Sequence, residues 1–142
     1  ADPDGVEGPP ETVSGLGLLD VATVLGGDKR LEHVDGRLAR LDAPVSGYEM
    51  HVGRTEGAGC ERPFLVFADG RPDGAERADG RVAGCYVHGL FADDRARSAF
   101  LADLGAETSD LAYDAEIERI LDALADHVAT HVDLDRLFSF AR

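Results

Sequence analysis

The stretch Gly84-Cys85-Tyr86-Val87-His88-Gly89-Leu90-Phe91 decides the fold of this 142-residue chain. The apolar and β-branched residues from Val82 to Val87 predict a strand. Gly89 predicts a turn directly after it, and a helix pattern follows. A strand that ends in a histidine can present a catalytic base, so His88 is a candidate general base. Taken alone, a histidine in this place is more often structural.

Composition allows one domain and limits the partners. The chain is 44% hydrophobic and 30% charged, which is ordinary for a globular protein with a core. Its formal net charge of -14 argues against nucleic-acid binding and against docking on anionic membranes. Lys29 is the one lysine among 14 cationic residues. Either adaptation to high salt or a GC-rich genome would account for this bias.

Targeting signals and cysteine usage favour a cytoplasmic location. We see no apolar run long enough to cross a bilayer and no secretory leader. Cys60 and Cys85 form neither a disulfide framework nor a CxxC metal motif, which is typical of reduced thiols. We expect Cys60 to be a surface thiol and Cys85 a small buried apolar residue.

Residues 12–91 are β-rich, with no convincing helix. The turn signals Asp69-Gly70, Asp73-Gly74 and Asp79-Gly80 separate short segments. Asp35-Gly36 is expected to interrupt one of the strands. The predicted strands or extended segments are Gly15–Leu25, Lys29–Leu41, Ala43–Thr55, Pro63–Phe67 and Arg81–Val87.

Residues 93–142 change to a helical period. Asp94 is expected to cap a helix from Arg95 to about Leu104, which Gly105 ends. A longer helix is predicted over 114–131, and Asp133 or Asp135 can start a last short one. The apolar face of the long helix consists of Ile117, Ile120, Leu121, Leu124 and Val128.

Three long motifs carry a family resemblance. They are G-L-G-L-L-D-V-x-T-V at 15–24, S-G-Y-E-x-H-x-G-R-T-E-G at 46–57 and D-G-x-V-x-G-x-Y-x-H-G-L-F at 79–91. In order and spacing they resemble the C-terminal part of the glutaminase domain of cobyric acid synthases, which are class I glutamine amidotransferases. The resemblance spans nearly the whole chain.

The resemblance implies a fold and a site. The fold would be α/β, a flavodoxin-like three-layer domain of which residues 1–142 form the C-terminal part, with mixed or antiparallel strands before the helices. His88 would be the catalytic histidine of the glutaminase site. Tyr48, His51 and Arg54 would lie near the glutamine pocket.

The resemblance also implies what lies outside this chain. The family couples the glutaminase to an N-terminal synthetase domain that uses ATP and Mg²⁺, so no cofactor or metal is expected in the present residues. Glutamine would be the substrate here. A corrinoid acceptor, adenosylcobyrinic acid a,c-diamide, would be amidated by the synthetase domain.

Two departures from the class I pattern bear on mechanism. The family nucleophile lies in a Gly-Cys-Gly-Gly elbow that opens a helix, and neither Cys60 nor Cys85 has that context. We therefore expect the nucleophile upstream of Ala1, and no glutaminase activity from this fragment alone. Leu90 stands where many class I enzymes have a glutamate, as in the cobyric acid synthase branch. Glu49 is a hypothetical group to orient His88.

Alternatives remain open at this point. The domain could serve a related amidotransferase, similar to cobyrinate a,c-diamide synthase or a cell-wall amidating enzyme, or be a non-enzymatic acidic binding domain. His127 and His131 have a spacing that can bind a metal, but a helix C-terminus also favours histidines. We expect the isolated fragment to be poorly stable or oligomeric, because it would expose an apolar sheet edge and helix face.

Overall fold

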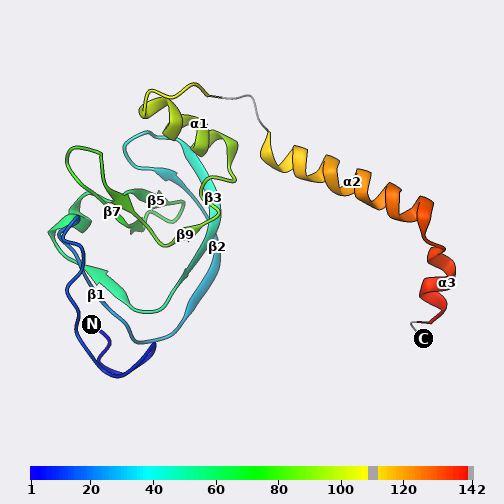
Figure 1. Cartoon of the computed structure of the whole chain (residues 1–142). Coiled ribbons are helices and arrows are strands. Elements are labelled where there is room, and N and C mark those ends of the chain that lie inside the picture. The colour runs from blue at the N-terminus through cyan, green and yellow to red at the C-terminus, as the bar shows by residue number, and fades with distance from the viewer. Residues whose placement is uncertain (109–111, 141–142) are drawn as a thin grey trace. The chain divides into compact units, whose positions relative to one another are not determined.

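A computed structural model describes residues 1–108 and 112–140 (Figure 1). The chain divides into two compact units, Ala1–Thr108 and Ser109–Arg142, and each is described by itself. In the described residues, no helix combines the length and the apolar character needed to cross a membrane. The first unit contains the sheets and the second consists of helices, so the chain has the strands and helices of the predicted α/β class.

The first unit is built around a five-stranded sheet with the order β6-β5-β2-β3-β9, in which every pairing is antiparallel. Two smaller antiparallel pairs, β1 with β4 and β7 with β8, complete its described strands. The strands are β1 Ala22–Val24, β2 Arg30–Leu38, β3 Pro44–His51, β4 Arg54–Glu56, β5 Leu65–Phe67, β6 Pro72–Asp73, β7 Ala75–Glu76, β8 Ala83–Gly84 and β9 Val87–His88.

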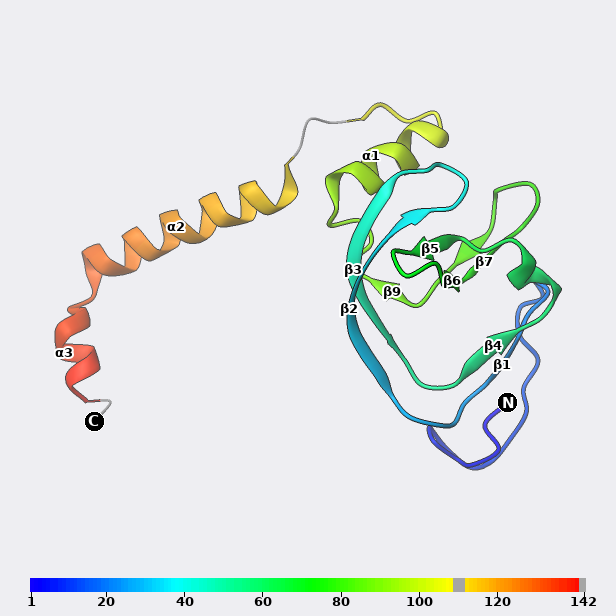
Figure 2. The ribbon, with the colours of Figure 1, turned by 180° about the vertical axis from the view of Figure 1, so that it is seen from behind.

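The long β2–β3 hairpin curves around the segments that carry β5, β6 and β7 (Figure 2). Because side chains alternate along a strand, one face of this hairpin is buried and the other is exposed. We call them the inner and the outer face. Val34, Leu38 and Val45 lie on the inner face, within a core that also holds Ala43, Phe64, Leu65, Phe67, Val87, Leu90 and Ala96. Leu38 and Leu65 are fully buried.

Two glycines allow strands to approach this hairpin closely. A Cβ at Gly36 would lie 2.5 Å from the carbonyl oxygen of Val66, and one at Gly47 would lie 2.4 Å from that of His88. The prediction that Asp35-Gly36 interrupts the second strand is therefore wrong. Strand β2 runs through both residues, and Gly36 serves the contact with β5 instead of a turn.

Two predicted strands are shorter than the sequence indicated. Only β1 is a strand within 15–25, since the preceding residues form bends and Leu16 and Leu18 are exposed. The predicted strand over 81–87 is divided into β8 and β9 by Cys85 and Tyr86. His88 itself belongs to β9, and the turn begins at Gly89, whose φ is 78°.

Helices follow the strands. A 3-10 helix, η1 (Ala58–Glu61), precedes β5, and helix α1 (Asp94–Asp103) follows β9. Asp93 caps α1 by accepting hydrogen bonds from the N–H groups of Arg95 and Ala96, one residue before the predicted cap. Ala96 packs in the core, and Arg40 holds the end of α1 through two 2.7 Å hydrogen bonds to Asp103.

The second unit contains the two remaining predicted helices, α2 (Tyr113–His131) and α3 (Leu134–Ser139). Asp133 caps α3 through the N–H of Arg136. No described residue of α2 or α3 is buried, although α2 carries the predicted apolar face. His131 Nδ1 lies 2.8 Å from the carbonyl oxygen of His127, so the backbone engages one ring nitrogen of these two histidines, whose spacing left metal binding open.

Candidate functional site

His88 lies on the edge strand β9 and is exposed. It pairs in register with Tyr48 of β3, and the two rings stack with centroids 5.5 Å apart and an interplanar angle of 10°. Tyr48 in turn pairs with His33 of β2, which is also exposed. Residues that lie directly opposite share a face, so His33, Tyr48 and His88 form a row on the outer face.

Local backbone features hold His88 in this row. Gly47 lets the His88 carbonyl approach β3, and the N–H of Met50 donates to the Tyr86 carbonyl at 3.2 Å. Gly89 ends the strand in a left-handed conformation, and Leu90 then enters the core. The imidazole is thus presented by a short strand that is fixed at both ends.

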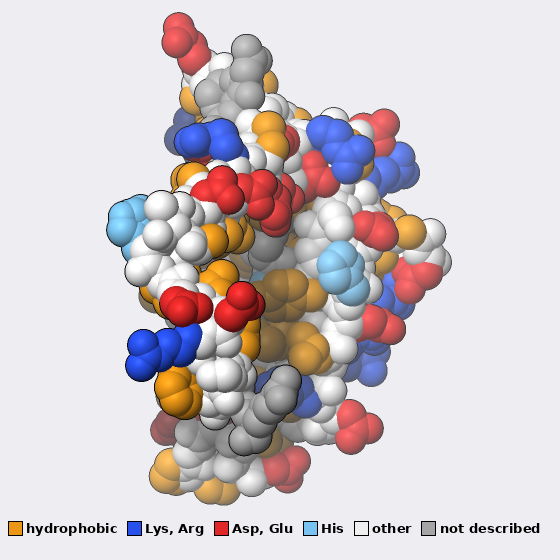
Figure 3. All heavy atoms as spheres, turned by 90° about the vertical axis from the view of Figure 1, so that its right-hand side faces the viewer, with side chains coloured by type: hydrophobic (Ala, Val, Ile, Leu, Met, Phe, Trp, Pro, Cys, Tyr) orange, Lys and Arg blue, Asp and Glu red, His pale blue; other side chains and the backbone are white. Residues whose placement is uncertain are grey.

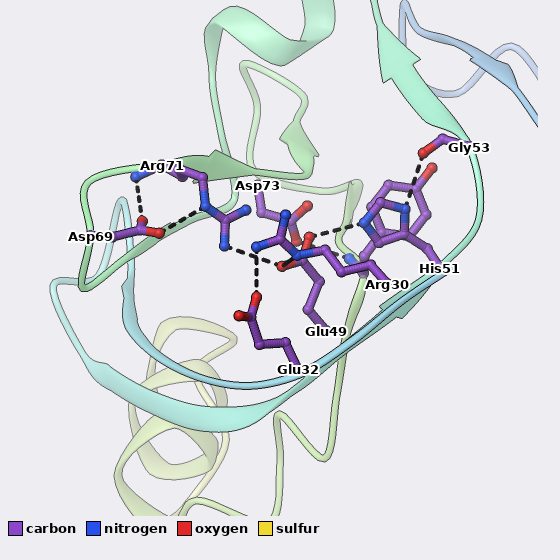
Figure 4. Close-up of polar contacts among 9 residues, drawn as sticks. Arg30, Glu32, Glu49, His51, Gly53, Asp69, Arg71 and Asp73 are labelled. Carbon is purple, nitrogen blue, oxygen red and sulfur yellow. Dashed lines mark hydrogen bonds and ion pairs between the residues drawn. The ribbon is translucent and has the colours of Figure 1, made fainter. Parts of the chain in front are cut away.

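A buried carboxylate lies on the inner face of β3. The residue next to Tyr48, Glu49, is 3% exposed. Its Oε2 pairs with Arg30 Nε at 2.8 Å and with Arg71 Nη2 at 3.2 Å, and its Oε1 lies 2.9 Å from His51 Nε2 (Figure 4). These side chains come from β2, β3 and the β5–β6 turn. We call Glu49, Arg30, Arg71 and His51 the Glu49 cluster.

The Glu49 cluster keeps its carboxylate ionised. Burial alone would raise the pKa of Glu49, but hydrogen bonds from His51 and Arg71 and the charge of Arg30 lower it further than burial raises it. His51 Nδ1 also lies 3.1 Å from the Gly53 carbonyl oxygen. Both ring nitrogens of His51 therefore lie within hydrogen-bonding distance of an oxygen atom, which fixes the orientation of the ring on the inner face.

The structure thus separates the predicted site residues. It brings Tyr48 to His88, and it places His51 on the inner face, stacked on Tyr86 with centroids 4.1 Å apart. Arg54 lies on β4, where its exposed guanidinium pairs with Glu56 at 2.7 Å. The hypothesis that Glu49 orients His88 is wrong, because adjacent residues of a strand point to opposite faces and the Glu49 carboxylate is engaged on the inner one.

Neither cysteine resembles an activated nucleophile. Cys60 lies in η1, with its sulfur 3.9 Å from the Thr55 carbonyl oxygen, and Cys85 points to the Val87 carbonyl oxygen at the same distance. Both thiols are free and half-buried. Burial raises the pKa of the Cys85 thiol, which disfavours the thiolate that attacks carbonyl groups.

The sequence did not predict His33, Arg30 or Arg71 as residues of this region, nor the ion pairs that join the two arginines to Glu49. The alternation of His33 with the apolar Val34 in β2 indicated a residue on the exposed face. Its position beside Tyr48 could not be predicted, because it depends on how β2 and β3 are aligned in the folded chain.

Acidic side chains are spread over the surface seen in Figure 3, in keeping with the net charge of -14. Glu49 differs from them because it is buried.

Comparisons with known proteins identify the family. The family described as a CobB/CobQ-like glutamine amidotransferase domain matches residues 1–96. Proteins named cobyric acid synthase match all 142 residues, at 56% identity in Bradyrhizobium sp., 58% in Cereibacter sphaeroides and 56% in Azorhizobium caulinodans. The chain spans 29% of the length of each of these relatives. The matched family residues include all the strands and His88, and the chain belongs to the CobB/CobQ-like glutamine amidotransferase family.

Proposed function

We propose that this chain is the C-terminal part of the glutaminase domain of a cobyric acid synthase. The domain would have the class I, flavodoxin-like three-layer fold. It would hydrolyse glutamine and supply ammonia for the ATP-dependent amidation of adenosylcobyrinic acid a,c-diamide in cobalamin biosynthesis. The shared name of the relatives favours this function over the related amidotransferases. The observation that carries the proposal is the exposed His88 ring, stacked on Tyr48 on the outer face.

His88 would act as general base and then as general acid. A cysteine thiol would give its proton to His88 and attack the side-chain amide carbon of glutamine. The resulting imidazolium would return a proton to the departing ammonia, and water would then hydrolyse the thioester. Because the relatives are much longer, we assign the thiol to polypeptide outside these 142 residues. The exposed outer face leaves the His88 ring accessible to such a thiol.

The other predicted residues would serve the substrate. Tyr48 is proposed to form one side of the glutamine site, since its ring lies flat beside the base. His51 is proposed to act indirectly, by holding Glu49 and therefore β3 in place. Arg54 would contribute its exposed guanidinium at the start of β4. These roles rest on the motif that contains all three residues.

The remaining reaction components are assigned elsewhere. ATP and Mg²⁺ would bind in a synthetase domain, as would the corrinoid acceptor. Within the described residues, no three His, Cys, Asp or Glu side chains converge as metal ligands. We propose a cytoplasmic enzyme on the basis of its free thiols, with no nucleic-acid or membrane partner, because the net charge of -14 opposes both.

The test uses the longer polypeptide that contains this chain. His88→Asn should lower glutamine-dependent amidation by roughly 10²- to 10⁴-fold. Amidation with added ammonium salt should continue, because it bypasses the glutaminase. His33→Asn is the matched control from the same row and should keep glutamine-dependent turnover. Full glutamine-dependent activity in His88→Asn would overturn the proposal.

A further inference from the structure

A second candidate site lies in a cavity of about 480 Å³. Its walls come from β1 with the residues before it, β4, η1, β6, β7 and the segment from Gly84 to Tyr86. The side chains that matter here are Leu19, Val21, Thr23, Thr55, Asp73 and Tyr86, with Arg54 also contributing. None of the outer-face row His33, Tyr48 and His88 lines this cavity.

Asp73 is a buried carboxylate for which the described part of the chain supplies no cationic partner. It is 9% exposed, and Oδ2 accepts a hydrogen bond from the Tyr86 N–H at 2.9 Å. Among the described residues, no arginine, lysine or histidine forms an ion pair with it. The neighbouring Arg71 is engaged by Asp69 and Glu49. By contrast, the buried Glu76 is paired with Arg40 at 2.9 Å.

The electrostatics of Asp73 show the same deficit of positive charge. Burial raises its pKa, and the backbone N–H groups of Tyr86 and Gly74 offset this only in part. The negative charge of Glu49 raises the pKa further, while His51 lowers it as a weaker influence. A cation placed against the Asp73 carboxylate would remove this cost, because opposite charges attract strongly where water is excluded.

The rest of the cavity offers hydroxyl groups and an apolar wall. Thr23 and Thr55 share a hydrogen bond at 2.6 Å between their hydroxyl oxygens, and Thr55 also bonds to the Tyr86 hydroxyl. Each hydroxyl oxygen has two acceptor lone pairs, so these linked hydroxyl groups can still accept a hydrogen bond from a ligand. Leu19 and Val21 supply apolar surface. A cavity with a few convergent polar groups and apolar walls is typical of a small-molecule site.

We propose that this cavity binds a small ligand with a primary ammonium group, which donates hydrogen bonds to the Asp73 carboxylate while its aliphatic part contacts Leu19 and Val21. The ammonium group has two possible sources. It can belong to a simple alkylamine, or to an amino acid whose carboxylate would meet the guanidinium of Arg54. The site lies apart from the outer-face row that carries the proposed glutaminase chemistry, and Arg54 is the one residue that the two proposals share.

The experiment titrates the longer polypeptide that contains this chain, ¹⁵N-labelled at tyrosine and glycine, with three probes of matched body and follows the backbone amide signals. The probes are n-butylammonium chloride, sodium butyrate and L-norvaline, which is butylamine with a carboxylate on the carbon that bears the nitrogen. Butylammonium should shift the Tyr86 and Gly74 amide signals in a saturable manner, and butyrate should not. Tighter binding of norvaline, lost in Arg54→Gln, would identify the amino acid as the source. If norvaline bound to the wild type and to Arg54→Gln with equal affinity, the simple alkylamine would be identified as the source of the ammonium group.

Variants at Asp73 provide the decisive comparison. Asp73→Asn keeps an oxygen that can accept the Tyr86 N–H but removes the charge, and it should weaken butylammonium binding at least tenfold. Asp69→Asn, an exposed carboxylate on the same β5–β6 turn, is the matched control and should bind normally. Equal affinity in Asp73→Asn, or butyrate binding as well as butylammonium, would overturn the proposal. If Asp73→Asn does not fold, the titration of the wild type tests the proposal by itself. Saturable shifts confined to residues other than Tyr86 and Gly74 would contradict it.

Discussion

Tyr48 and His88 lie directly opposite each other on β3 and β9, with their rings stacked at 5.5 Å and nearly parallel. This stack is the only ring contact of His88 among the described residues. It limits rotation of the imidazole without occupying either ring nitrogen. The nitrogens therefore stay available for proton transfer while the plane of the ring is fixed.

Replacing Tyr48 should affect turnover through the His88 ring. In the longer polypeptide, Tyr48→Phe keeps the stack and should retain glutaminase activity, whereas Tyr48→Ala should lower kcat about 3- to 10-fold, since such aromatic pairs contribute ~0.5–1.5 kcal/mol. Steady-state assays across pH measure this effect. A pH profile unchanged in both variants, with an effect on KM alone, would indicate that Tyr48 only contacts substrate.

Gly47 should be intolerant of any side chain. Its Cβ would lie 2.4 Å from the His88 carbonyl oxygen and 2.8 Å from Val87 Cγ1, so Gly47→Ala has to push β9 away from β3. We expect a loss of about 2 kcal/mol in the free energy of unfolding, as for other overpacked sites. Chemical denaturation measures it. Gly15→Ala, where nothing lies within 4 Å, is the control. Equal stability of the two variants would contradict this account.

Glu49→Gln should destabilise the first unit strongly. The change leaves Arg30 and Arg71 without a shared counter-charge, and breaking a buried ion pair costs about 3–5 kcal/mol. We expect the lower end of that range, because the two arginine side chains are 40% and 38% exposed. Glu32→Gln removes a more exposed partner of Arg30 and should cost less than about 1 kcal/mol. Similar losses in both variants would argue against the Glu49 cluster as a structural centre.

Glu49 should also make stability depend on acid. Its folded pKa is lowered from the ordinary 4.5, so its ionised form stabilises the fold fully above that pH. The contribution is lost as the pH falls through the lower, folded pKa. Unfolding free energies measured between about pH 6 and pH 3 should therefore fall less steeply in Glu49→Gln than in the wild type. Parallel curves would show that other carboxylates control acid unfolding.

Asp73 should show the opposite sign. Its folded pKa is raised above the ordinary 3.8, so ionisation costs stability above the folded pKa, and acid relieves that cost. At neutral pH, Asp73→Asn should therefore be at least as stable as the wild type, within about 0.5 kcal/mol. Thermal unfolding of both proteins at neutral pH measures this. A large loss of stability in Asp73→Asn would show that the carboxylate has a cationic partner after all.

The helices were predicted more accurately than the strands, for a physical reason. Helical hydrogen bonds are local, so the apolar period and Asp133 were enough to place α2 and α3. Strands depend on distant partners. The residues from Gly15 to Asp20 have strand-like composition but find no neighbouring strand, whereas β2 continues through Gly36 because β5 approaches it there.

The site was predictable only where it lay in one motif. The strand-turn pattern predicted His88 as a candidate base, and the family resemblance predicted that Tyr48 lies near the same site. The sequence did not predict that Tyr48 lies on the outer face while Glu49 and His51 engage partners on the inner face, because this depends on the register of β2, β3 and β9. Arg30 and Arg71 are far from Glu49 in sequence and gave no signal. Buried ion pairs of this kind become visible only when the chain is folded.

The open position of the imidazole has a consequence for handling and regulation. The His88 ring is exposed to solvent in this chain, where no thiol or substrate is held against it, so the ring alone would catalyse no reaction. Catalytic competence would begin only when other polypeptide shields the ring from bulk water. An acylating reagent such as diethyl pyrocarbonate should thus label His88 readily in the separate chain and slowly in the longer polypeptide that contains it.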